Sequence, residues 1–172
     1  MPAFSKLEQY LTIRKRHTKS LDNGFVLENR SYRARFRLTS ATLLNSEFPA
    51  FLFFVRYSEF LPEDFSVGLS LLKLNELERD AILVRAQGPH GGFTQNINEG
   101  MIHHNTFHVH KLTDDDFNNK RGQPSHPEAV DQFASMQDAL HFMVKYCNIE
   151  TDSIEKIFAN LGYKSVQQCS IF

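Results

Sequence analysis

Histidine is the residue type whose spacing in this sequence most directly suggests chemistry. Five of the eight histidines lie in one stretch of the chain: His90, His103, His104, His108 and His110. An imidazole has a reference pKa near 6.5, so at neutral pH one ring can accept a proton while another donates one. The stretch is therefore a candidate site for general acid–base catalysis.

His108 and His110 are the two histidines whose spacing gives the clearest structural prediction. They belong to the alternating segment 106–112 (TFHVHKL), which predicts a strand, and residues two apart in a strand point to the same face. His90 falls instead in a predicted loop with Gly88, Gly91 and Gly92. Glycines without side chains would let a substrate come close to the backbone there.

Arginine side chains could supply the positive charge that such chemistry needs. Arg33, Arg35 and Arg37 alternate along the predicted strand 32–38, and Arg85 lies in the predicted strand 80–86. Cleavage of RNA through its own 2′-hydroxyl requires an acid, a base and a cation near the phosphate. The sequence is compatible with this reaction if the arginine strands neighbour the histidine strand.

Other interpretations of the same residues remain open. His90, His104, His108 and His110 could bind Zn²⁺ or Fe²⁺, because His-x-His is a common ligand spacing. The histidines could equally be ordinary half-buried strand residues. The arginine stripe could be a solvated outer face of the sheet, or a surface that binds nucleic acid or an acidic protein without catalysis.

The elements that must position these residues predict an α+β fold. About five strands follow one another with short connections, which favours an antiparallel sheet. Two C-terminal helices are expected to pack on one face of this sheet. We expect one domain, divided as follows: an N-terminal helix in 1–20, the sheet in 24–112, a loop in 113–130, a helical pair in 135–162 and a tail in 163–172.

Composition limits the class of protein and the cellular compartment. The chain has 172 residues, 19 Lys+Arg against 20 Asp+Glu and a formal net charge of −1, which excludes a globally basic nucleic-acid binder. Two cysteines, Cys147 and Cys169, are too few for a disulfide framework and suggest a reducing compartment. Because the sequence also shows neither a signal peptide nor a membrane-spanning run, we expect a cytoplasmic protein without a membrane partner.

The middle of the chain resembles a group of small bacterial proteins. The matching residues are Ile82-Leu83-Val84-Arg85, Gly88-Pro89-His90-Gly91-Gly92, His103-His104 and Phe107-His108-Val109-His110. The later segment from Phe133 to Ile149 is similar to the closing helix of that group. A similar turn and histidine strand occur in the TumE-type toxins of bacterial toxin–antitoxin modules. The resemblance covers about residues 30–149 and implies RNase activity.

Together these observations predict a metal-independent endoribonuclease of a defence or toxin–antitoxin module. His108 and His110 would be the acid and base, with His90 positioning the phosphate or sharing the proton transfer. The residues expected to bind substrate are Arg33, Arg35, Arg37, Arg85, His103 and His104. The expected partners are RNA, or another phosphate-bearing substrate, and a cognate antitoxin-like protein. No cofactor is expected unless the protein binds Zn or Fe through its histidines.

Overall fold

The computed structural model describes residues 5–41, 50–72, 80–90, 105–124 and 127–163. The helices in these ranges are α1 (Lys6–Thr12), α2 (Asp114–Asn118), α3 (Met136–Tyr146) and α4 (Thr151–Asn160). The strands are β1 (Lys15–Ser20), β2 (Val26–Glu28), β3 (Ser31–Ser40), β4 (Phe51–Ser58), β5 (Phe65–Leu71), β6 (Ala81–Gln87), β7 (His108–Lys111) and β8 (Pro127–Ala129). The protein is α+β, as the sequence predicted.

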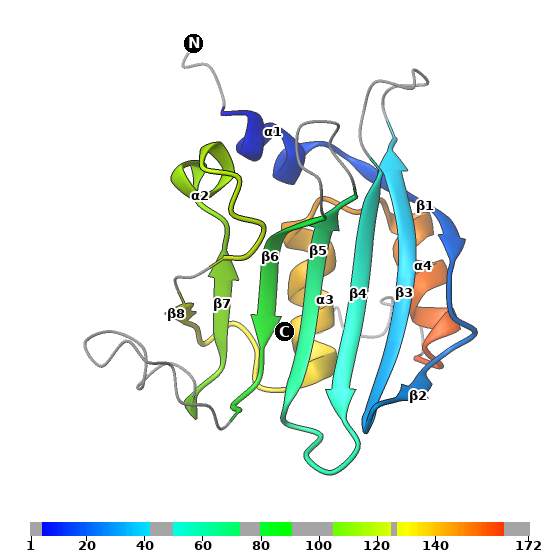
Figure 1. The fold of residues 1–172 in the computed structure, drawn as a ribbon. Helices are drawn as coiled ribbons and strands as arrows, with labels where there is room; N and C mark the ends of the chain where they lie inside the picture. The colour runs from blue at the N-terminus through cyan, green and yellow to red at the C-terminus, as the bar shows by residue number, and fades with distance from the viewer. Residues whose placement is uncertain (1–4, 42–49, 73–79, 91–104, 125–126, 164–172) are drawn as a thin grey trace.

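The strands form one eight-stranded sheet, so the expected count of about five was wrong. Its order is β1-β3-β4-β5-β6-β7-β8, with β2 also paired to β3, and the strands pair antiparallel (Figure 1). The five predicted strands correspond to β3–β7. The three additional strands lie toward the two ends of the sheet, and β2 and β8 have only three residues each. Segments of three residues are too short to show the period-two pattern that identifies a half-buried strand.

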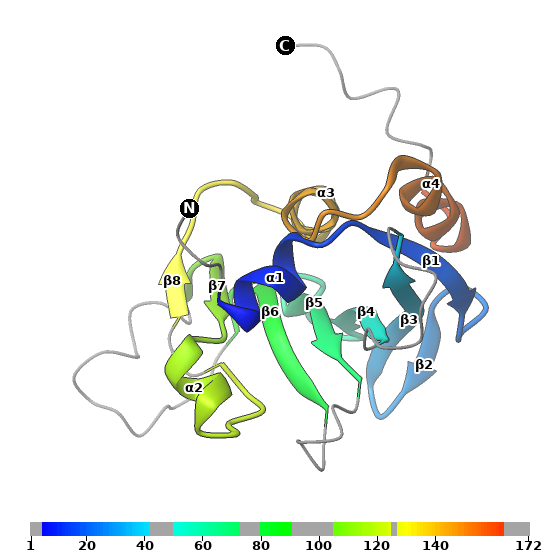
Figure 2. The ribbon, with the colours of Figure 1, turned by 90° about the horizontal axis from the view of Figure 1, so that it is seen from above.

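The apolar face of the sheet packs against the C-terminal helices. Phe36, Phe53, Leu69 and Val84 are opposite one another on β3, β4, β5 and β6, and all are fully buried. Helices α3 and α4 lie on this side of the sheet (Figure 2). Because side chains alternate along a strand, the intervening residues point to the other side. We call this second side, turned away from α3 and α4, the polar face.

The two C-terminal helices begin and end close to where the sequence indicates. Ser135 is the N-cap of α3 and accepts a hydrogen bond from the backbone N–H of Asp138 at 3.1 Å. Helix α4 is followed by Gly162, whose φ of +77° suits glycine after a helix end. None of the described helices is both long enough and apolar enough to span a bilayer.

The N-terminal helix is shorter than the predicted 1–20. Helix α1 ends at Thr12, and β1 begins at Lys15, where the backbone N–H donates to Asn148 O at 2.9 Å. Lys15 also pairs with Ser40 on β3. These partners are distant in sequence, so no local pattern in the charged segment KRHTKS reveals the strand.

Lys15 is fully buried where α1, β1 and the end of α3 meet. Its ammonium donates hydrogen bonds to three backbone carbonyls, Leu11 O at 3.0 Å, Ile13 O at 2.8 Å and Cys147 O at 2.9 Å. All three carbonyls follow or end a helix, where intrahelical donors are lacking. Burial lowers the pKa of Lys15 to about 8, with a smaller opposing effect of Cys147. One side chain thus joins the end of α1 to the end of α3.

Lys15→Met is expected to lower the free energy of unfolding by about 2–4 kcal/mol at pH 7, because three buried carbonyls lose their donor. The exposed Lys19→Met on the same strand is the control, and urea unfolding measures both variants. The native pKa of about 8 lies below the unfolded value of 10.5, so the unfolded chain binds the extra proton between these pH values. The stability of the parent relative to Lys15→Met should therefore rise from pH 8 to pH 10.5, by at most about 1.4 kcal/mol per pH unit. A pH-independent difference would contradict this account of Lys15.

The segment expected to be a loop, 113–130, contains α2 and β8. Thr113 Oγ1 accepts a hydrogen bond from Asp116 N, and the Asp116 carboxylate accepts one from Thr113 N, which forms a capping box. Asp116 is 1% exposed and also accepts a hydrogen bond from Arg121 Nη1 at 3.0 Å. Asp114, Asp115 and Asp116 thus form the first turn of α2. Negatively charged residues are favourable there because the N-terminal end of a helix carries a partial positive charge.

Cys147 is fully buried at the C-terminal end of α3, as its place on the apolar stripe indicates. Burial raises the pKa of its thiol to about 12. Since the thiolate is the reactive form, we expect native Cys169→Ser protein to react with Ellman's reagent at pH 8 at least about 100-fold more slowly than urea-unfolded protein. Equal rates in the two states would show that Cys147 is accessible.

Candidate functional site

The strand registers align the polar face into two rows that run across the sheet. The first row consists of Arg33, Arg56, Ser66, Gln87 and His108, on β3 to β7 in order. The second row consists of Arg35, Phe54, Gly68, Arg85 and His110, on the same strands. Arg85 and His110 are therefore direct neighbours, and so are Gln87 and His108.

Three of the predicted histidines lie together at the β6–β7 end of these rows. The ring centroids of His108 and His110 are 5.1 Å apart, and those of His90 and His108 are 5.2 Å apart. His108 is 0% exposed and His110 4% exposed, whereas His90, just after β6, is half-buried. The structure thus brings together the three residues that the sequence suggested as acid and base, with His108 in the middle.

The hydrogen bond of His108 defines which of its nitrogens takes up a proton. His108 Nδ1 lies 2.7 Å from the backbone oxygen of Thr106. A carbonyl oxygen only accepts, so Nδ1 carries the hydrogen and donates it. In the neutral ring the lone pair is then on Nε2, so this is the nitrogen that can accept a proton. The backbone just before β7 thereby orients the ring, as a carboxylate does in other histidine sites.

Arg85 provides a positive charge directly beside the histidines. Its Nε atom is buried and has no hydrogen-bond partner, and no carboxylate among the described residues forms an ion pair with its guanidinium. Burial, and to a smaller extent the charge of Arg56, lowers the pKa of Arg85. A half-buried guanidinium that finds no carboxylate in the described part of the chain costs free energy on folding and is a suitable site for an anion.

Gly68 explains how the polar face is covered beside Arg85. A Cβ atom at Gly68 would clash with the far end of the Phe54 ring, so this ring lies over the glycine. Gly68 is directly opposite Arg85 in the sheet. Strand β5 therefore carries a glycine where the Phe54 ring crosses its backbone, next to Arg85 on β6.

The arginine stripe on β3 is separate from the histidines. Strands β4, β5 and β6 lie between β3 and β7, which places the two about 19 Å apart at 4.8 Å per strand. Arg35 forms a two-point ion pair with Asp22 at 2.9 and 3.1 Å, which lowers the pKa of Asp22, and Arg33 pairs with Glu28. The assumption that the arginine strands neighbour the histidine strand therefore holds for Arg85 and fails for Arg33, Arg35 and Arg37.

Two predicted substrate-binding residues, His103 and His104, lie outside the described residues. His104 was also one of the four candidate metal ligands. In the described ranges, no group of three or more His, Cys, Asp or Glu side chains is arranged to hold a metal ion.

Sequence reasoning missed Gln87, Ser66 and Arg56, which share a row with His108. Gln87 was assigned to the loop after β6, but it is the last residue of that strand. Ser66 lies in a strand that is buried throughout, and a single serine in such a strand gives no signal of a functional site. The usable signal was the alternation of Ala86 and Gln87 at the end of β6, which puts Gln87 on the same face as Arg85.

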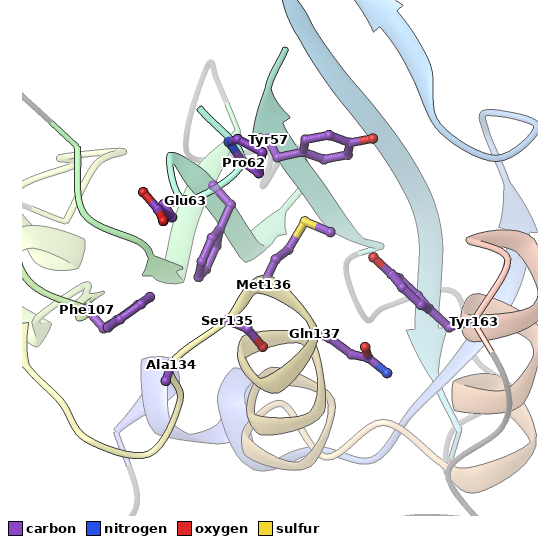
Figure 3. Close-up of a pocket in the computed structure, with 10 residues that line it drawn as sticks. Tyr57, Pro62, Glu63, Phe107, Ala134, Ser135, Met136, Gln137 and Tyr163 are labelled. Carbon is purple, nitrogen blue, oxygen red and sulfur yellow. The ribbon is translucent and has the colours of Figure 1, made fainter. Parts of the chain in front are cut away.

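A separate pocket of about 350 Å³ lies on the helix side of the sheet. Its walls include Met136 at the start of α3 and the rings of Tyr57, Phe107 and Tyr163 (Figure 3). These residues belong to the apolar side of the sheet and are not part of the histidine cluster. The polar face is therefore the better candidate for chemistry.

Comparison of the chain with protein-family models, with curated proteins and with solved structures gives no match. The case for a functional site thus depends on the geometry of Arg85, Gln87, His90, His108 and His110.

Proposed function

We propose that this protein is a metal-independent endoribonuclease whose reaction centre is formed by His108, His110 and Arg85. The observation that carries the proposal is the register of β6 and β7, which places a half-buried arginine, with no carboxylate partner among the described residues, directly beside a histidine pair. Cleavage of an RNA phosphodiester through the 2′-hydroxyl requires this combination of base, acid and cation.

In the proposed reaction, His108 Nε2 accepts the proton of the 2′-hydroxyl. The 2′-oxygen attacks phosphorus, the 2′-O–P bond forms and the P–O5′ bond breaks. Protonated His110 donates its proton to the leaving 5′-oxygen, so the products are a 2′,3′-cyclic phosphate and a 5′-hydroxyl. Arg85 stabilises the charge that develops on the non-bridging oxygens. His90, beside His108, positions the phosphate or returns protons to the pair.

The burial of the histidines has two consequences for this proposal. Electrostatic stabilisation by Arg85 is stronger away from water than at the surface. In addition, RNA reaches His108 and His110 only when the groups that cover them are displaced. His90 is half-buried and Arg56 is exposed, so both are more accessible than the histidine pair. In the proposed reaction the phosphate approaches from the side of these two residues. We therefore expect slow turnover that is limited by this displacement.

The proposal of a toxin–antitoxin role, with a cognate antitoxin-like protein as partner, rests on the resemblance to TumE-type toxins alone. The alternative of a binding module that uses the arginine stripe is weakened by two ion pairs, because Arg33 and Arg35 are each paired with a carboxylate of this chain. Arg37 is the exposed member of the stripe.

The direct test is incubation of the protein with a fluorescent oligoribonucleotide in the presence of EDTA. We expect cleavage, and the same cleavage when Mg²⁺ or Zn²⁺ is added. Cleavage that appears only with added metal would favour the His-ligated metalloprotein instead.

A further inference from the structure

Gln87 stands out among the buried polar groups that the proposed reaction does not use. It is 8% exposed and lies directly opposite His108, with its side chain on the polar face. Its Nε2 donates a hydrogen bond to Ser66 Oγ at 3.1 Å. Its Oε1 is buried and has no hydrogen-bond partner in the described part of the chain. A buried acceptor without a donor costs free energy, and a bound ligand that supplies the donor would explain why it is kept.

The Ser66 hydroxyl holds the amide of Gln87 in place. Ser66 is 7% exposed and is the direct neighbour of Gln87 across β5 and β6. Nε2 keeps a second hydrogen, but Oε1 is the amide atom that has no partner in the described part of the chain, and an acceptor binds a group that carries a hydrogen.

Two residues further back on β6, Arg85 presents the complementary group. Its Nε is a buried donor without a hydrogen-bond partner among the residues that the structure describes, and it shares the polar face with Gln87. Residues two apart in a strand are about 6.6 Å apart along the chain, at 3.3 Å per residue. One ligand can therefore reach both side chains if it carries an anionic oxygen and a hydroxyl close together. A ribonucleotide linkage, with its 2′-hydroxyl beside the 3′-phosphate, has this chemistry.

We propose that Gln87 Oε1 accepts a hydrogen bond from the 2′-hydroxyl of a ribonucleotide whose 3′-phosphate is bound by Arg85. This assignment rests on the proposed function, because it places the ligand in the same site. It goes further in making Gln87 the residue that distinguishes RNA from DNA at the step of binding. In the bound ground state the single hydrogen of the 2′-hydroxyl goes to Gln87 Oε1, and cleavage requires the hydroxyl to turn this hydrogen toward His108 Nε2.

The test uses two ligands that the proposed reaction cannot cleave. Binding of a ribonucleoside 3′-monophosphate and of its 2′-deoxy counterpart is measured by titration calorimetry, for each of the four bases. We expect the parent protein to bind the ribonucleotide about tenfold more tightly, the effect of one hydrogen bond to a buried acceptor. Gln87→Met has a similar size and no amide, so it should bind both ligands with the affinity of the deoxy form. Gln137→Met, on α3 at the other side of the sheet, should keep the preference.

Ser66→Ala provides a second variant, because it removes the partner of Gln87 Nε2 and leaves Oε1 in place. We expect it to reduce the preference without abolishing it. If Gln87→Met keeps the tenfold preference, or if the parent binds neither ligand, the assignment of Gln87 is overturned.

Cleavage assays separate this result from the proposed function. Parent protein that cleaves RNA while Gln87→Met keeps the preference contradicts the role of Gln87 only. Parent protein that shows a Gln87-dependent preference without cleavage supports the binding site and contradicts the endoribonuclease.

Discussion

His108→Ala and His110→Ala are each expected to lower the rate of RNA cleavage by about 10²–10⁴-fold in the presence of EDTA, the usual contribution of a general acid or base. His108 loses the nitrogen that takes the 2′-hydroxyl proton, and His110 loses the proton for the leaving oxygen. The two rings are 5.1 Å apart and act on one phosphodiester, so the double variant should be little slower than either single variant.

The pH dependence should separate the two roles. With the parent protein we expect a bell-shaped rate profile, because one ring must be neutral and the other protonated. In His108→Ala the limb that reports the base should disappear. The control is His17→Ala on β1, which should leave the profile unchanged. Variants that cleave as fast as the parent would show that His108 and His110 are structural residues.

Arg85→Met is expected to change activity and stability in opposite directions. Loss of the guanidinium removes the charge that stabilises the transition state, so cleavage should fall by about 10²–10³-fold. The free energy of unfolding should rise by about 1–2 kcal/mol, because an apolar side chain of similar length replaces a half-buried cation that forms no ion pair within the described ranges. Cleavage kinetics and urea unfolding of the same preparation measure the two effects.

Arg37→Met is the matched control, since Arg37 is exposed on the same face of the sheet. It should change stability by no more than about 0.5 kcal/mol and cleavage by no more than about twofold. A less stable Arg85→Met protein with unchanged cleavage would mean that Arg85 serves the fold.

The elements with a clear period were predictable from the sequence. The alternation of Tyr32, Ala34, Phe36 and Leu38 identifies β3, and the stripe of Met136, Leu140, Met143 and Val144 identifies α3. Strand β1 was not predictable, because its residues are charged and its pairing depends on distant partners. Lys15 illustrates the difficulty, since a lysine in a charged segment is fully buried and donates hydrogen bonds to three carbonyls.

The candidate site was predictable in part. Period two alone puts His108 and His110 on one face. The neighbour of this pair depends on strand order, which placed Arg85 beside His110 and the β3 arginines three strands further away. To place Gln87 beside both Ser66 and His108, one must know the register of β6 against β5 and against β7. Local patterns define faces, whereas strand order and register define which faces meet.

The central claim is cleavage through the 2′-hydroxyl by a histidine pair, and product analysis tests it most directly. The substrate is a DNA oligonucleotide with a single ribonucleotide, incubated with the parent protein and EDTA. We predict one cut, on the 3′ side of the ribonucleotide, with a 2′,3′-cyclic phosphate and a 5′-hydroxyl as the new ends. An uncut substrate, or a product with a 3′-hydroxyl and a 5′-phosphate, would contradict the claim.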